Sequence, residues 1–255
     1  MLKNLIIIAL PALLLLCACE PTGPANLKPG RTTTDNAVSA NINVGVEYMR
    51  RKEFEKALEK LERARQLDPG YFQTYNMLGV LYQRLGQNRQ AEDSFKKALR
   101  LNGADSPTLN NYGQFQCQAG RFREAAETFE RAAGNPLYDT PEIPLTNAGL
   151  CALRNNDVPG AEQYLRHALE LNPKFAEALL PMIQIIYDDA NYLSARGYLQ
   201  RYLEVGQHTA KTLWLGIQIE KQLGDNNAVS SYALQLRNNF PNSQEAGLLE
   251  QSGTR

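Results

Sequence analysis

Small residues recur along this chain at a constant interval of 34 positions, between larger apolar ones. The interval separates the members of one glycine series and one alanine series: Gly45, Gly79 and Gly113, and Ala57, Ala91 and Ala125. A small residue at each of two such positions lets two antiparallel helices approach closely, and large apolar residues fill the space around the contact. The pattern therefore predicts a series of helical hairpins, one for each interval.

The interval and the placement of large residues are typical of tetratricopeptide repeats. A first unit starting at Val38 places Tyr48, Leu61 and Pro69 at pattern positions, and further units start near residues 72, 106, 142, 176 and 210. The last two units lack the glycine of the series Gly45, Gly79 and Gly113, which is position 8 of each unit. One hairpin cannot bury its apolar faces alone, so neighbouring units stack. We expect an all-α, right-handed superhelical solenoid of about six hairpins over residues 38–250.

One connection breaks the regular interval. The third and fourth units start at Ser106 and Glu142, which is 142 − 106 = 36 residues apart instead of 34. The two extra residues fall in the segment Asn135-Pro136-Leu137-Tyr138-Asp139-Thr140-Pro141. Because prolines end helices, this segment is predicted to be a loop.

The inner wall of such a solenoid, built mainly from the first helix of each unit, is the default binding surface. At the unit positions that face the groove in proteins of this kind, the side chains are apolar in the first unit and become rich in amides in the next two. They are Ile42, Val46, Met49, Asn76, Val80, Gln83, Arg84, Asn110, Gln114 and Gln118. Apolar anchors and amides together suit an extended or helical peptide. The alternative is a solvated inner face with no ligand.

Composition disfavours several classes of function. The 255 residues carry 27 basic and 27 acidic side chains, whereas nucleic-acid binders that neutralise phosphates usually have a basic surplus. His167 and His208 are the only histidines. His167 falls at position 26 of the fourth unit, on the outer helix face, and His208 lies in a predicted turn with no carboxylate or cysteine nearby in the sequence. No glycine-rich phosphate loop follows a strand. We expect no enzyme activity, metal, nucleic acid or small-molecule substrate.

The first residues read as an export signal. Lys3 precedes an apolar run of 12 residues from Leu5 to Leu16, too short for a bilayer span, which needs about 20. The run ends in Leu16-Cys17-Ala18-Cys19, which resembles a bacterial lipobox. Residues 1–18 are therefore expected to be a lipoprotein signal peptide, with Cys19 carrying diacylglycerol and an N-acyl chain as the mature N-terminus.

Two other processing schemes are open. Cleavage before Cys17 would put Leu16 where a small residue is expected, and an ordinary signal cleaved near Ala18 would leave no lipid. The resemblance to lipoproteins would link an aspartate directly after the lipidated cysteine with retention at the inner membrane. Glu20 stands there instead, so the resemblance implies delivery to the outer membrane. Residues 19–37, rich in Pro, Gly and Thr, are expected to form a flexible tether. The membrane contact is then made by lipid alone.

Two cysteines remain in the repeat region. Cys117 and Cys151 fall at position 12 of the third unit and position 10 of the fourth. Side chains two positions apart on a helix point in directions that differ by about 200°. The two thiols therefore project toward each other from first helices that pack side by side. The exported compartment is oxidising, so we expect a disulfide. The alternative is two unpaired buried thiols.

Several strings carry a closer resemblance. Leu109-Asn110-Asn111-Tyr112-Gly113-Gln114-Phe115 is similar to a stretch of the type IV pilus biogenesis/stability lipoproteins, the PilF/PilW pilotin family. Further similarity lies at Asn147–Leu150, Leu215–Ile217, Ser231–Leu236 and Phe240-Pro241. The resemblance runs from the lipobox to near the end of the chain. The Cys117–Cys151 pair departs from the family pattern, which does not require it.

The resemblance implies a non-enzymatic lipoprotein of the outer membrane, facing the periplasm, that helps the pilus secretin localise or multimerise. The expected partner is that secretin, with other pilus-assembly proteins as further candidates. A general periplasmic scaffold for envelope or cell-wall machinery is the alternative, because it too is built on tetratricopeptides and the repeats cannot separate the two.

Overall fold

The structure is a computed structural model that describes residues 29–253. Helices make up its regular structure throughout this range, and no strand occurs in it. The first six helices are α1 (Pro29–Arg50), α2 (Phe54–Leu67), α3 (Phe72–Arg84), α4 (Asn88–Leu101), α5 (Ser106–Gln118) and α6 (Phe122–Ala133). The others are α7 (Glu142–Arg154), α8 (Val158–Leu171), α9 (Ala176–Asp188), α10 (Tyr192–Leu203), α11 (Ala210–Leu223), α12 (Asn226–Asn239) and α13 (Gln244–Gln251). The all-α prediction is confirmed.

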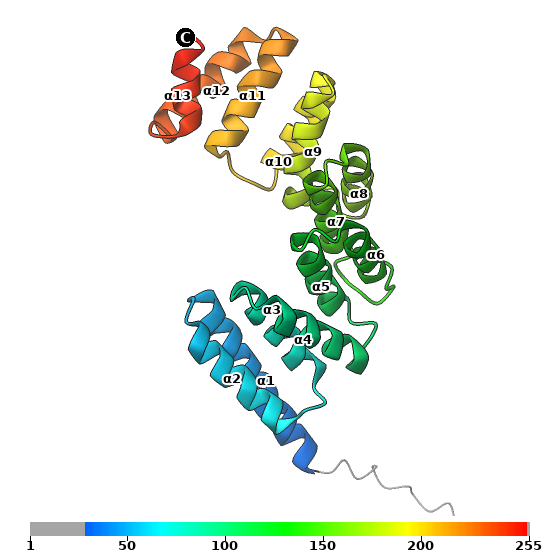
Figure 1. The fold of residues 1–255 in the computed structure, drawn as a ribbon. Coiled ribbons are helices and arrows are strands. Elements are labelled where there is room, and N and C mark those ends of the chain that lie inside the picture. The colour runs from blue at the N-terminus through cyan, green and yellow to red at the C-terminus, as the bar shows by residue number, and fades with distance from the viewer. Residues whose placement is uncertain (1–28, 254–255) are drawn as a thin grey trace, which may run out of the picture.

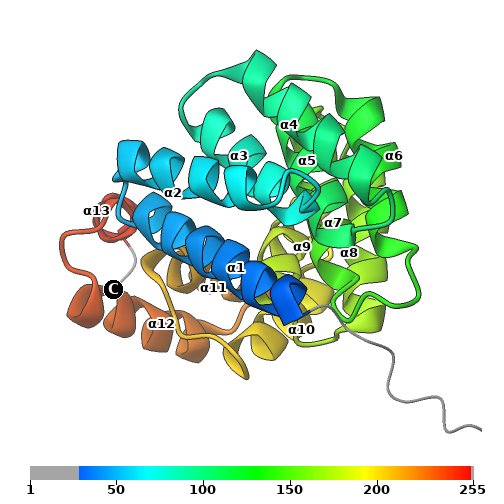
Figure 2. The same ribbon diagram turned by 90° about the horizontal axis from the view of Figure 1, so that it is seen from below.

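The helices pair into six hairpins that stack along a curved path (Figure 1). Each odd-numbered helix from α1 to α11 packs most extensively against the helix that follows it. The odd-numbered helices α3 to α11 begin at the residues where the 34-residue frame starts its units: Phe72, Ser106, Glu142, Ala176 and Ala210. Seen from below, the stack curves round, with α6 and α12 toward the rim and α1, α9 and α11 nearer the middle (Figure 2). The predicted tetratricopeptide solenoid is therefore the observed architecture.

Two glycines allow the two helices of a hairpin to approach. A Cβ built on Gly79 would lie 2.7 Å from the ring of Phe95, and one built on Gly113 would lie 2.8 Å from the ring of Phe129. Both rings are almost completely buried. At these positions the aromatic ring of the second helix thus occupies the space that a side chain on the first helix would need, so the residue must be glycine.

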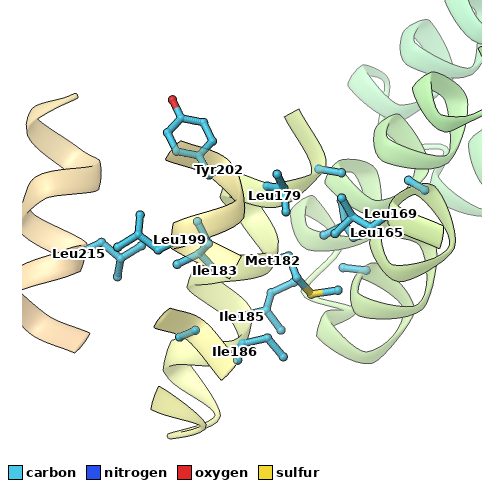
Figure 3. Packing of buried hydrophobic residues seen from close by; sticks show 14 of the residues in the cluster. Leu165, Leu169, Leu179, Met182, Ile183, Ile185, Ile186, Leu199, Tyr202 and Leu215 are labelled. Carbon is cyan, nitrogen blue, oxygen red and sulfur yellow. The ribbon is translucent and has the colours of Figure 1, made fainter. Parts of the chain in front are cut away.

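The apolar core continues from one unit into the next. Around α9, buried side chains from the five helices α7 to α11 form one cluster (Figure 3). Leu165 and Leu169 come from α8, and Leu199 from α10, while Leu215 joins from α11. Met182 and Ile183 of α9 are fully buried at its centre. Stacking therefore supplies the burial that no single hairpin achieves alone.

The N-terminal boundary of the folded part differs from the expectation. We predicted a flexible tether over residues 19–37, but α1 begins at Pro29, so residues 29–37 are helical. Pro29 is the first helical residue, where the amide hydrogen that proline lacks would have no partner within the helix. Val38, completely buried, holds this helix on the first core cluster. The predicted signal peptide and Cys19 lie outside the described residues.

The last helix, α13, has no partner of its own and packs against α11 and α12. Ser243 precedes it as the N-cap, and the Ser243 side chain accepts a hydrogen bond from the amide of Ala246 at 3.1 Å. Ala246 and Leu249 are buried on the final hairpin. The helix thus covers the apolar end of the stack, as a terminal cap must. No helix in residues 29–253 is long and apolar enough to cross a membrane.

Candidate partner-binding site

Asparagine side chains join the first helices of neighbouring units on the inside of the curve. Asn111 Nδ2 of α5 donates to Asn76 Oδ1 of α3 at 3.0 Å, and Asn147 Nδ2 of α7 donates to Asn110 Oδ1 of α5 at 2.8 Å. The accepting residues, Asn76 and Asn110, are only 3% and 8% exposed. Their amides hold adjacent helices together. The prediction that these two residues line an accessible groove is wrong.

The apolar end of the predicted groove is also covered. Ile42 and Met49 of α1 are buried in the first core cluster, and Val46 is half-buried against the same cluster. The reason is that α2 and α3 both pack on α1, so these positions face neighbouring helices instead of the solvent. Ile42 and Met49 are therefore core residues, and the prediction that they anchor a peptide is wrong.

The other predicted groove residues come together around one pocket. It has a volume of about 340 Å³ and lies between α3 and α5. Five of its six lining residues were predicted from their unit positions, and Asn111 was missed: Val80, Gln83, Arg84, Asn111, Gln114 and Gln118. Asn111 follows a predicted groove position directly, and the 34-residue period that selected Asn110 had no reason to select its neighbour.

Hydrogen bonds hold the polar walls of this pocket. Gln83 Nε2 donates to Gln118 Oε1 at 2.7 Å, which ties α3 to α5. Arg84 Nη1 donates to the carbonyl oxygen of Met49 at 3.2 Å, which ties α3 to α1. Amide groups, one guanidinium and the apolar side of Val80 therefore surround a single hollow. This combination can hydrogen-bond a peptide backbone and carries one positive charge.

A disulfide closes the junction beside this pocket. Cys117 of α5 and Cys151 of α7 are joined, with their Cα atoms 5.9 Å apart and a sequence separation of 34. Both residues are nearly buried and pack with Ala125, Phe129 and Ala148. The bridge joins the first helices of the third and fourth units, where the two-residue insertion interrupts the regular stack.

The histidines do not gather with other reactive groups. His167 is exposed on α8. His208 lies edge-on to the Tyr232 ring with centroids 5.4 Å apart, and burial lowers the pKa of its imidazole. Among residues 29–253, no group of three or more His, Cys, Asp or Glu side chains is placed to hold a metal ion.

Comparison with known proteins places the chain among tetratricopeptide repeat proteins. Models of the tetratricopeptide repeat match residues 36–104, 76–140 and 117–175. The type IV pilus assembly protein PilF of Pseudomonas aeruginosa strain PAO1 is 30% identical over 230 residues, which is 90% of this chain and 91% of that protein.

Solved structures give the same result. The structure of Pseudomonas aeruginosa PilF superposes with a TM-score of 0.75 at 29% identity, covering 86% of this chain and 99% of that one. PilW, described as a widely conserved type IV pilus biogenesis factor, superposes with a TM-score of 0.70 at 31% identity over 83% of this chain and 97% of its own. The chain therefore belongs to the family of tetratricopeptide type IV pilus biogenesis factors that includes PilF and PilW.

Proposed function

We propose that this protein is a non-enzymatic lipoprotein of the outer membrane that faces the periplasm and promotes the localisation or multimerisation of the pilus secretin. The observation that carries the proposal is the similarity to PilF over 90% of the chain, together with a polar pocket on the inner wall. The lipid on Cys19 would route the body to the outer membrane, and the inner wall would hold a secretin segment.

Sequence and energetics together support the proposed lipid anchor. The apolar run before Cys19 is too short to span a bilayer. One acyl chain gives only marginal membrane binding, and stable anchoring takes a second chain. Diacylglycerol with an N-acyl chain on Cys19 meets that requirement. Because acidic and basic side chains balance over the whole sequence, we assign the membrane attachment to the lipid.

The inner-wall pocket is the proposed secretin contact. Its amides can satisfy the backbone groups of a short peptide segment, and Arg84 can pair with a carboxylate. The disulfide and the asparagine pairs hold α3, α5 and α7 at fixed spacing, so the pocket needs little reorganisation on binding. No covalent chemistry takes place in this role.

Substitution of Gln118 by arginine tests the inner-wall pocket in cells. Gln118 is exposed, so Gln118→Arg adds bulk and charge to the pocket without disturbing the core. Gln200→Arg is the matched control, because Gln200 is exposed on α10 away from the pocket. We expect Gln118→Arg to lower the detergent-resistant secretin multimer, surface pili and twitching motility, and Gln200→Arg to leave all three unchanged.

A Cys19→Ser variant tests the lipid. It should accumulate unprocessed at the inner membrane and lose secretin multimers, and mass spectrometry of the wild type should find acyl chains on Cys19. Equal multimer levels in Gln118→Arg and the control would refute the assignment of the inner-wall pocket as the secretin contact. A deletion strain with normal pili and a cell-wall defect would instead support a general envelope scaffold.

A further inference from the structure

The insertion between the third and fourth units forms a fixed loop. Asn135 Nδ2 donates to the carbonyl oxygen of Ala104 and to Ser106 Oγ, both at 3.1 Å, while Asn135 Oδ1 accepts from the amide of Leu137 at 3.0 Å. The amide of Tyr138 donates to the Asn135 carbonyl oxygen at 3.0 Å. Asn135 therefore ties the start of the loop to the third unit and fixes the turn over residues 135–138.

A pocket of about 540 Å³ lies beneath this loop. Its walls come from the loop, from the end of α6 and from α8, with Tyr138 and Tyr164 among them and Leu145 of α7 in its lining. Helices α6 and α8 are the second helices of their units and lie on the outside of the curve, whereas α5 and α7 lie nearer its centre (Figure 2). The pocket is thus separate from the inner-wall pocket between α3 and α5.

A second hollow continues from this pocket along α8. It has a volume of about 520 Å³ and shares Gln163 and His167 with the first, so the two form one groove. We call it the outer groove. It combines an end lined by aromatic rings and prolines with an end lined by charged side chains.

The outer groove has an excess of negative charge. Three carboxylates line it, from Glu130, Glu162 and Glu170, against the one guanidinium of Arg166. Arg166 is already ion-paired with Glu162. Glu130 accepts a hydrogen bond from Tyr164 Oη. Glu170 forms no ion pair with another residue of the described range.

Apolar side chains are exposed at the same place. Leu137 at the tip of the loop is 88% exposed, the highest value among the large exposed apolar residues of the described chain, and Leu171 at the end of α8 is 50% exposed. Leu171 also lines the pocket beneath the loop. A fixed loop that holds a leucine in the solvent beside an open apolar pocket is typical of a protein-binding surface.

We propose that the outer groove binds a peptide segment of a partner protein that carries a bulky apolar residue together with a lysine or arginine. The apolar side chain would enter the pocket between Tyr138 and Tyr164, and the adjoining part of the peptide would pack against Leu137, which lies outside the pocket lining. The basic side chain would pair with Glu170, which complements the negative charge of the groove. Because this surface is on the outside of the curve, its occupant and a segment in the inner-wall pocket can be bound at the same time.

A phage-displayed library of random twelve-residue peptides, selected on the purified protein without its signal peptide, tests the proposal. Enriched peptides are synthesised with a fluorophore, and their dissociation constants are measured by fluorescence anisotropy. We expect Leu137→Ser to weaken binding about tenfold, since about 1.4 kcal/mol of apolar burial corresponds to that factor. Glu170→Lys should weaken it by roughly threefold to tenfold, with a further loss at higher salt.

Matched controls separate the groove from general surface effects. Leu193→Ser removes another exposed leucine, at 69% exposure on α10, and Glu250→Lys reverses another exposed carboxylate, on α13 at the far end of the stack. Both should bind the peptides like the wild type. Circular dichroism of all four variants should give the wild-type melting temperature, because the substituted side chains are exposed.

Three results would overturn the proposal. The first is that no enriched peptide loses affinity in Leu137→Ser or Glu170→Lys. The second is that the enriched peptides whose affinity falls in Leu137→Ser are acidic instead of basic. The third is sedimentation showing a dimer of the wild type that Leu137→Ser abolishes, because the occupant would then be a second copy of this chain.

Discussion

The close approach at Gly79 makes a prediction that a matched pair of glycine substitutions can test. A Cβ at residue 79 would lie 2.7 Å from two atoms of the Phe95 ring and 2.9 Å from a third. Phe95 is completely buried and packs against the rings of Tyr112 and Phe115 at centroid distances of 5.7 and 5.8 Å. Because the ring is buried between these neighbours, we expect Gly79→Ala to displace a helix or force an unfavourable rotamer.

Gly197 of α10 supplies the control. It also lies within a helix, but a Cβ there would meet no heavy atom within 4 Å. Replacing a helical glycine by alanine favours the folded state by about 1 kcal/mol through helix propensity. That gain is common to both variants, so the difference between them isolates the overpacking, which costs about 1 to 3 kcal/mol.

Urea denaturation followed by circular dichroism measures the two free energies of unfolding. We expect Gly197→Ala to be as stable as the wild type or up to about 1 kcal/mol more stable. Gly79→Ala should lie about 1 to 3 kcal/mol below Gly197→Ala, which corresponds to roughly 2 to 12 °C in melting temperature for a protein of this size. Equal stability of the two variants would refute the reasoning that the repeating glycine is required by the ring opposite it.

Three further predictions concern other contacts. Reduction of the Cys117–Cys151 disulfide, which spans 34 residues, should lower the free energy of unfolding by about 3 to 4 kcal/mol in the chain-entropy model, measured by urea denaturation with and without a phosphine reductant; an unchanged midpoint would contradict it. Arg196→Ala leaves the carboxylate of Glu220, whose side chain is 4% exposed, without its main partner and should lower the free energy of unfolding by about 1 to 3 kcal/mol. Arg166→Ala, at an exposed ion pair with Glu162, should change it by less than about 1 kcal/mol, and urea denaturation measures both. Burial lowers the pKa of His208 in the folded state, so the unfolded state takes up the proton at a higher pH. Stability should therefore fall as the pH drops below about 6.5, the ordinary pKa of histidine, and this pH dependence should weaken in His208→Phe. Thermal melts from about pH 5 to about pH 8 check this, and identical pH profiles of the two proteins would contradict it.

The repeat period predicted most of the architecture because it reports directly on packing. Gly79 and Gly113 recur at the points where a ring of the second helix contacts the first, so the unit starts at Phe72 and Ser106 follow from the sequence. The start of α1 at Pro29 did not follow. The residues before Val38 have no counterpart in later units, and their composition is typical of a linker.

The inner wall could be predicted only in part. Unit positions correctly grouped Gln83, Gln114 and Gln118 around one pocket. Met49 occupies in the first unit the position that Gln83 occupies in the second, yet neighbouring helices cover Met49, as they cover Ile42. How far one helix covers its neighbour depends on the crossing geometry of the units, which a period does not contain. The outer groove was not predicted either, because it depends on the path of the inserted loop over α6 and α8.

Direct binding to the secretin is the central claim, and isothermal titration calorimetry of purified components measures it. The protein without its signal peptide and lipid is titrated with the soluble periplasmic region of the pilus secretin from the same organism. We predict saturable binding that Gln118→Arg weakens by about tenfold or more and that Gln200→Arg leaves unchanged. Absence of binding by the wild type, or equal affinity of the two variants, would contradict the account.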